Sequence, residues 1–209
     1  MQNRRWLIVG ITGSGKSYFT ISLINKYVAL KQRGHVVIVD STDAYKEEIP
    51  YLKHCEVKPL DYSQIDFERI ITEHQNVLFE VSGLLPKQDV LFMDALCKSI
   101  MEVQDILLVV DEAHRYLPKD KPSNEFLILL REGRKHYIDS IIITQFPIDL
   151  NLIARRQANS LVVFKLLDDT DTEKVAYYLE MKPEEIRDLE LFDFLLKDRN
   201  TGEMIKGRL

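Results

Sequence analysis

Residues 10 to 17 read GITGSGKS and place three glycines, a lysine and two serines within one short turn. Gly10 and Gly15 frame four residues, and Lys16 and Ser17 follow at once, which is the phosphate-binding pattern G-x-x-x-x-G-K-[ST]. Glycines allow a loop to turn its backbone N–H groups toward a phosphate, and a following helix directs its positive end there. The lysine of this pattern contacts the β- and γ-phosphates, and the hydroxyl can bind Mg²⁺.

The pattern lies between an apolar, strand-like run and a helical stretch, which disfavours the alternative of a glycine-rich turn that binds nothing. We therefore predict that this loop binds ATP together with Mg²⁺, and that Lys16 also assists catalysis. The predicted nucleotide-binding residues are Gly10, Ile11, Thr12, Gly13, Ser14, Gly15, Lys16, Ser17 and Tyr18.

Two carboxylates follow the apolar run Ile106–Val110, which is predicted to be a strand buried on both faces. Open α/β sheets hold their ligands at the carboxyl ends of the strands. Asp111 is therefore predicted to bind Mg²⁺ beside Ser17, and Glu112 to polarise a water for attack on the γ-phosphate. A solvated pair of carboxylates that only caps the strand is the alternative.

The elements that must position these groups alternate along the chain, with β-branched apolar runs separated by helical stretches. This order predicts an α/β fold with a mostly parallel central sheet flanked by helices on both faces. Helices are expected at Ser17–Gln32 and Lys87–Val103, and the tail is expected to form a β-hairpin that turns at Asn200–Gly202 and extends the sheet edge. The predicted strands are Arg5–Ile11, Val36–Asp40, Val77–Val81, Ile106–Val110, Ser140–Thr144 and Leu161–Phe164.

Composition limits the class of protein. With 209 residues, 45% hydrophobic and 29% charged, we expect one domain, residues 1–209. No apolar run of eighteen residues and no leader ahead of the first strand are present, so we expect neither a membrane segment nor a signal peptide, and a cytoplasmic location. Cys55 and Cys97 are expected to be buried, reduced thiols. A net charge of −5 does not indicate nucleic-acid binding, so any DNA contact must come from local basic patches.

The order of the motifs resembles that of P-loop ATPases with an additional catalytic glutamate. Two predicted strands separate Lys16 from Asp111, and the next predicted strand, Ser140–Thr144, ends on Gln145. The resemblance implies that Gln145 senses the γ-phosphate beside Asp111. Nucleoside and nucleotide kinases share the glycine-rich motif but generally lack the other two.

Nearly the whole chain resembles the HerA/FtsK superfamily of DNA-translocating ATPases. The matching features are a DEAH strand end, an R-x-G-R-K segment, a strand that closes on T-Q, a short P-x-D stretch and an N-x-x-x-x-F strand. They occur at Asp111–His114, Arg131–Lys135, Thr144–Gln145, Pro147–Asp149 and Asn159–Phe164. Because the phosphate loop already begins at residue 10, the chain is most similar to the short genome-packaging ATPases of membrane-containing icosahedral viruses, including archaeal ones.

This resemblance implies a ring, hexameric or pentameric, that couples ATP hydrolysis to movement of double-stranded DNA into a preformed capsid. Capsid, portal or membrane proteins are then possible partners, in the host cytoplasm or at a virion vertex. A DNA-end-processing translocase that works with a nuclease, a conjugation or secretion motor, and a small-molecule kinase are the alternatives.

The resemblance also implies catalysis between neighbouring subunits. Arg134 matches the arginine that the family inserts into the adjacent protomer's site, and Arg131 is the second candidate; a surface charge is the alternative for both. The roles of Arg155 and Arg156 stay open. For DNA contact, the loop Tyr116–Ser123 carries two lysines between prolines, although Asp120 separates them and a plain solvated loop fits equally well. The segment Ser41–Pro50, which follows the second predicted strand, is too acidic to bind the phosphate backbone of DNA well.

Overall fold

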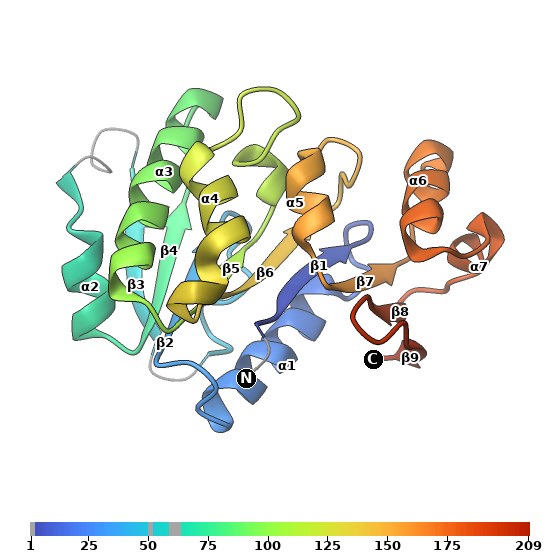
Figure 1. Ribbon diagram of the computed structural model, residues 1–209, viewed down its shortest axis with the longest axis horizontal. Coiled ribbons are helices and arrows are strands. Elements are labelled where there is room, and N and C mark those ends of the chain that lie inside the picture. The colour runs from blue at the N-terminus through green and yellow to red at the C-terminus, as the bar shows by residue number, and fades with distance from the viewer. Residues whose placement is uncertain (1–2, 50–51, 59–63) are drawn as a thin grey trace.

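The computed structural model describes residues 3–49, 52–58 and 64–209. Its described strands form one nine-stranded sheet in the order β3-β4-β2-β5-β6-β1-β7-β8-β9 (Figure 1). Neighbouring strands from β3 to β7 pair in parallel, and the last two strands pair antiparallel. The strands are β1 (Arg5–Val9), β2 (His35–Asp40), β3 (Leu52–Val57), β4 (Asn76–Val81), β5 (Ile106–Val110), β6 (Asp139–Thr144), β7 (Ser160–Phe164), β8 (Asp193–Asp198) and β9 (Met204–Arg208).

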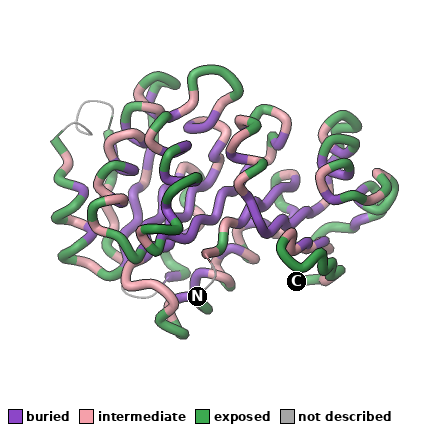
Figure 2. The backbone as a smooth tube through the Cα atoms, in the orientation of Figure 1, coloured by how far each residue is buried: buried purple, intermediate pink, exposed green. Residues whose placement is uncertain are grey.

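The central strands are buried on both faces, as their continuous β-branched runs require, and the outer sides of the helices face solvent (Figure 2). One core lies between the sheet and the helices from α2 onward. The other lies under α1 and the loop that follows β2. The helices are α1 (Lys16–Ala29), α2 (Phe67–Glu73), α3 (Pro86–Val103), α4 (Asn124–Glu132), α5 (Leu152–Gln157), α6 (Asp169–Leu179) and α7 (Pro183–Arg187).

The expected mostly parallel sheet with helices on both faces is confirmed, and so is the C-terminal hairpin, β8 and β9. The strand boundaries differ little, although β1 ends at Val9 because the phosphate loop already begins at Gly10. Helix α1 ends at Ala29 instead of Gln32, since Leu30 leaves the helical conformation and Lys31 takes a positive φ of 48°. None of the helices in the described part of the chain is both long and apolar enough to cross a bilayer.

One strand was not predicted. In the described residues, three strands, and not two, lie between Lys16 and β5, the strand that ends just before Asp111, because β3 forms the sheet edge beyond β4. Its sequence LKHCEV is short and polar, and its side chains are partly exposed, as is common for an edge strand. The sequence therefore lacked the continuous apolar run that identified the central strands.

The sheet order brings the predicted site residues to one edge. Strand β6 lies between β1 and β5, and all three are parallel, so the phosphate loop, Gln145 and Asp111 follow strand ends at the same carboxyl edge. Helix α4 then returns the chain from the carboxyl end of β5 to the amino end of β6. The turn Gly133–His136 consequently lies at the opposite, amino edge.

Candidate nucleotide site

The phosphate loop is held in its turn by two glycines with positive φ and by two side chains that donate to the Ile11 carbonyl. Gly13 and Gly15 take positive φ values of 75° and 108°, which residues with a Cβ rarely adopt. The Lys16 ammonium folds over the loop and donates to the Ile11 carbonyl at 2.8 Å, and the Ser14 hydroxyl donates to the same oxygen at 2.7 Å. Burial lowers the pKa of Lys16, and the carboxylates across the site act in the opposite direction. A phosphate would give this buried cation a stronger acceptor than a carbonyl.

Asp111 lies across the site from the loop and is almost completely buried. Burial raises the pKa of its carboxyl group, while the Glu112 N–H donates to Oδ1 at 2.8 Å and lowers it. Two hydroxyls face Oδ2: that of Thr42 at 3.0 Å and that of Tyr45 at 3.3 Å. Burial raises the pKa of the Tyr45 phenol, and the Ser17 and Thr20 hydroxyls act to lower it, so this one buried side chain lies next to both predicted Mg²⁺ ligands.

Sequence reasoning missed the loop that carries these hydroxyls. Asp40 ends β2 and accepts hydrogen bonds from the N–H groups of Thr42 at 2.8 Å and Ala44 at 2.9 Å, which folds the loop under the site. The side chain of Tyr45 is fully buried there. The segment Ser41–Pro50 is exposed at Thr42, Asp43 and residues 46–48, but Tyr45 and Ile49 are buried, and Pro50 lies outside the described residues. Tyr45 lies among charged residues in the sequence, so its neighbours did not predict that its side chain would be buried.

Gln145 connects the second carboxylate to the phosphate loop. Its amide Nε2 donates to Glu112 Oε1 at 2.9 Å, and its Oε1 accepts from the Thr12 hydroxyl at 2.8 Å. Glu112 has a left-handed backbone, with φ 46° and ψ 48°, which is strained for a residue with a side chain. His114 Nδ1 lies 3.2 Å from Glu112 Oε2. Gln145 thus holds Oε1 of the carboxylate, while Oε2 is buried without a hydrogen-bond partner among the described residues, at the edge where the γ-phosphate of a bound nucleotide would lie.

Divalent-cation chemistry fits these residues. Mg²⁺ keeps several waters and uses one or two protein ligands plus substrate phosphates, so it does not need a cage of three carboxylates. Ser17 and Asp111 supply a hydroxyl and a carboxylate that already share one buried neighbour, Tyr45. The donor set is entirely oxygen, as Mg²⁺ prefers.

The predicted arginines do not join this site within one chain. Arg131 ends α4 and Arg134 lies in the turn Gly133–His136, both exposed at the amino edge. The His136 carbonyl there accepts from the Asp105 N–H at 2.9 Å, just before β5 begins. Arg134 lies near Arg5, whose pKa is lowered first by burial and then by Arg134.

The two arginines without an assigned role lie in α5. The Arg155 guanidinium stands 5.4 Å from the centre of the Tyr178 ring, as in a cation–π contact, and Arg156 is exposed. Neither is brought to the phosphate loop, because α5 ends at the amino edge where β7 begins.

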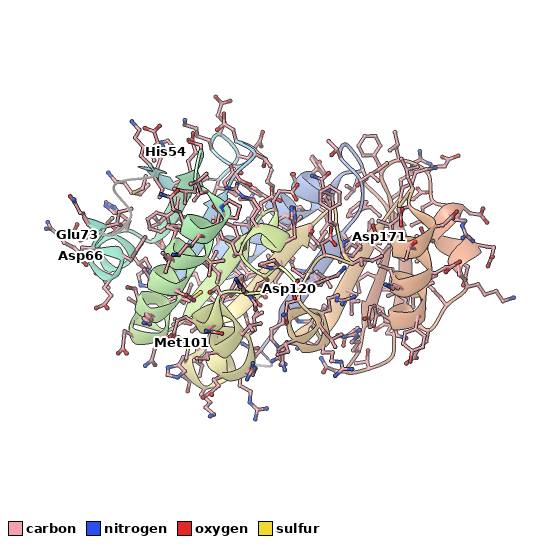
Figure 3. The ribbon with its side chains drawn as sticks, turned by 90° about the horizontal axis from the view of Figure 1, so that it is seen from above. His54, Asp66, Glu73, Met101, Asp120 and Asp171 are labelled. Carbon is pink, nitrogen blue, oxygen red and sulfur yellow. The ribbon has the colours of Figure 1, made fainter. Side chains whose placement is uncertain are left out.

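The loop Tyr116–Ser123 is less of a surface excursion than expected. Tyr116 and Leu117 are buried, and Pro118 pairs with Leu150, so only residues 119–121 are exposed. Lys119 is 3.2 Å from Asp149. Figure 3 shows Asp120 near the middle of the view from above, well separated from Asp171 on α6. The local charge is therefore mixed, which does not favour a dedicated DNA clamp.

Comparison with solved structures gives the fold. The packaging NTPase B204 from Sulfolobus turreted icosahedral virus 2, in complex with ATP-gammaS, aligns with a TM-score of 0.75 at 20% identity, covering 100% of this chain and 98% of that chain. VirB4 of Thermoanaerobacter pseudethanolicus aligns with a TM-score of 0.76 at 13% identity, covering 100% and 90%. The bacterial conjugative coupling protein TrwB gives 0.73 at 13%, covering 99% and 85%. No curated protein matches this chain.

The parallel sheet, the glycine-rich loop and the carboxylates at the same sheet edge define a P-loop ATPase of the additional-catalytic-glutamate type. The family described as "Helicase HerA, central domain" matches residues 1–203. The chain therefore belongs to that family, within the HerA/FtsK superfamily.

Proposed function

We propose that residues 1–209 act as an ATP-driven motor that moves double-stranded DNA, and that its task is to package a viral genome into a preformed capsid. The observation that carries this proposal is the extent of the match to B204, the DNA-packaging ATPase from Sulfolobus Turreted Icosahedral Virus: the alignment covers 100% of this chain and 98% of that chain. The location that this function requires is the host cytoplasm or a virion vertex, with capsid, portal or membrane proteins as partners.

In the proposed reaction the phosphate loop binds the triphosphate of ATP, and Lys16 leaves the Ile11 carbonyl for the β- and γ-phosphates. Ser17 and Asp111 would hold Mg²⁺, which would supply positive charge to neutralise the phosphates. Glu112 accepts the proton of the attacking water, and Gln145, bonded to Glu112 and to Thr12, reports the presence of the γ-phosphate.

The last catalytic group comes from a neighbouring copy in this proposal. Arg134, with Arg131 as the second candidate, is exposed at the edge opposite its own phosphate loop. A head-to-tail contact places the amino edge of one chain on the carboxyl edge of the next, and repetition of such a contact closes a pentameric or hexameric ring. An arginine supplied in this way can raise the hydrolysis rate by roughly 10³–10⁵.

A second candidate function has its own observation. VirB4 and TrwB share the fold at TM-scores of 0.76 and 0.73, which supports a conjugation or secretion motor. A HerA-type end-processing motor that works with a nuclease uses the same ATPase site. These candidates share the chemistry and differ in the partner that receives or cuts the DNA.

The first experiment measures ATP turnover with and without double-stranded DNA, and strand displacement of a triplex-forming oligonucleotide as a sign of translocation. We expect DNA to raise turnover and the triplex to be displaced. Lys16→Ala should weaken nucleotide binding, whereas Glu112→Gln should bind ATP and lower turnover by about 10²–10⁴ because only the water activation is lost. Parent-like turnover of Glu112→Gln would show that the base is misassigned, and turnover without triplex displacement would reject translocation.

A test of packaging itself needs the proposed partner, the viral capsid. The parent protein should bind purified empty capsids and protect added DNA from nuclease in an ATP-dependent way. Stable binding to a nuclease or to a membrane secretion complex, with no capsid binding, would favour the second candidates.

A further inference from the structure

An apolar surface borders the phosphate loop on the side where α1 begins. Three exposed side chains lie near this end of the loop: Phe192 at 46% and Leu209 at 40%, which both face Gly15, and Tyr18 at 68%, which follows Gly15 by three residues. Tyr18 lies in the first turn of α1, while Phe192 precedes β8 and Leu209 follows β9. The C-terminal hairpin therefore carries two of these groups to the loop, from positions more than 170 residues away in the sequence.

The contact with the loop is direct. A Cβ built on Gly15 would lie 2.6 Å from Leu209 Cδ1 and 3.3 Å from Phe192 Cδ1. Both side chains thus touch the glycine that precedes the phosphate-binding lysine. The Leu209 N–H donates to the Phe192 carbonyl at 3.1 Å, which holds the two residues together. Any larger residue at position 15 would displace this pair.

Phe192 has a strained backbone. Its φ of 71° lies in the left-handed region, which an aromatic residue seldom occupies. The segment is fixed on both sides, since the Asp193 N–H donates to the Glu190 carbonyl at 3.2 Å. Strain of this kind persists where the surroundings enforce it, and such residues cluster at ligand sites. Here the strain holds an aromatic ring beside the loop and partly open to solvent.

We propose that Phe192 and Leu209, together with Tyr18, form the surface that binds the nucleobase of the nucleotide. This inference rests on the proposed function, because it assumes that the loop holds a triphosphate. A nucleotide bound by the loop directs its sugar and base away from Glu112, past the start of α1. A flat base gains from an aromatic and aliphatic surface at that point, since nucleotide sites combine a few polar groups with apolar walls.

A second apolar patch on the other side of the loop fits a base less well. It contains Leu167 and Phe146, both exposed, but Asp168 and Asp171 line the same hollow. The Asp171 carboxylate already accepts from the Ile148 N–H at 3.0 Å. Two carboxyl groups would repel the phosphates of a nucleotide placed there, whereas the surface of Phe192 and Leu209 carries no charge in its side chains.

The test separates base binding from phosphate binding. The affinities of MgATP and of inorganic tripolyphosphate are measured by titration calorimetry for the parent, for the double variant Phe192→Ala with Leu209→Ala, and for Phe192→Tyr. We expect the affinity of the double variant for MgATP to fall about tenfold, because it loses the stacking of the base on the aromatic ring. Its affinity for tripolyphosphate should not change, because that compound has no base. Phe192→Tyr should keep both affinities, because it keeps the ring.

Two matched controls use exposed leucines that the proposal does not involve. Leu191→Ala removes the neighbour of Phe192, and Leu167→Ala removes the more exposed of the two apolar groups in the second patch. Both variants should bind MgATP as the parent does. Equal loss of MgATP and tripolyphosphate in the double variant would overturn the proposal, because the pair would then only shape the loop. If the double variant binds both compounds as the parent does but self-associates more weakly, the surface contacts another copy instead. If Leu167→Ala loses affinity for MgATP but not for tripolyphosphate, the nucleobase binds at the second patch. A parent protein that binds neither compound would reject the proposed function itself.

Discussion

The hydroxyls of Thr42 and Tyr45 around Asp111 are the feature of the site that its motifs do not contain. A carboxylate with a pKa raised by burial is poorly suited to hold a cation unless other groups stabilise its charged form. Thr42 and Tyr45 are placed to do this, with oxygens 3.0 and 3.3 Å from Oδ2. Burial holds the pKa of Tyr45 well above its usual value, so the phenol keeps its proton and can donate it.

Tyr45→Phe tests this role, since it keeps the buried ring and removes only the hydroxyl. We expect nucleotide affinity measured with Mg²⁺ to fall several-fold, while the affinity measured in EDTA stays that of the parent. Tyr27→Phe is the matched control: Tyr27 is also buried in α1, but its phenol contacts Trp6 and Asp139 at the amino edge.

Both variants should lose about 1 kcal/mol in the free energy of unfolding, because each loses a buried hydrogen bond. Only Tyr45→Phe should change the Mg²⁺ dependence. An equal effect of the two variants on nucleotide binding, or none in either, would reduce Tyr45 to a packing residue.

At the scale of helices and strands, buried elements were predictable and partly exposed ones were not. Strand β5 was predicted with its observed bounds because ILLVV is continuous and apolar, and Pro86 marked the start of α3 within one residue. Strand β3 was missed because an edge strand needs no such run. Local composition determines the first kind of element, whereas pairing with a neighbour determines the second.

The same division holds for the site. Asp111, Glu112 and Gln145 could be predicted to meet the phosphate loop, because parallel strands end at one edge. Tyr45 and Phe192 could not, since their positions depend on how a loop folds back and on where a hairpin docks. Neither has a sequence pattern that distinguishes it from an ordinary loop aromatic.

An ion pair joins α3 to the segment after Glu112. Arg115 donates to Asp89 through Nη2 at 2.9 Å and Nε at 3.2 Å, and the Asp89 side chain is almost completely buried. Burial raises the pKa of Asp89, and Arg115 lowers it. Arg115→Leu leaves this carboxylate without its cation, so we expect the free energy of unfolding to fall by about 1–3 kcal/mol in urea titrations.

The control is an exposed pair of the same type. Arg69 and Glu73 form an ion pair on the surface of α2, and Figure 3 shows Glu73 at the outer end of the molecule. Arg69→Leu should leave the free energy of unfolding close to that of the parent, because exposed ion pairs contribute little. Adding Asp89→Leu to Arg115→Leu should restore part of the loss. A double variant less stable than Arg115→Leu alone would contradict this account.

For the whole molecule, the proposed composite site predicts that activity depends on assembly. Turnover per chain should rise with protein concentration as rings form. Arg134→Ala should bind ATP normally and hydrolyse it poorly, since the transition-state charge lacks its partner. When Arg134→Ala chains are mixed with Glu112→Gln chains, some interfaces combine an intact Glu112 with an intact Arg134, so turnover should partly recover.

Co-assembly of the two variants must be verified by mass spectrometry or by a tag on one of them. Mixed rings that turn over ATP no faster than the sum of the separate variants would exclude the role of Arg134 between chains. The same mixture with Arg131→Ala in place of Arg134→Ala distinguishes the two arginines, because only the one that enters the neighbouring site can complement.

The phosphate loop and Arg134 lie at opposite ends of the same sheet, and this separation gives the proposed ring a sense of direction. A contact between two unlike surfaces cannot contain a two-fold axis, so every chain in the ring points the same way and the ring has two different faces. The DNA duplex offers no such asymmetry, because its two strands run antiparallel and its phosphates look alike from either end. Which way the DNA travels is then decided by which face of the ring it enters, and reversing the transport would require turning the ring over.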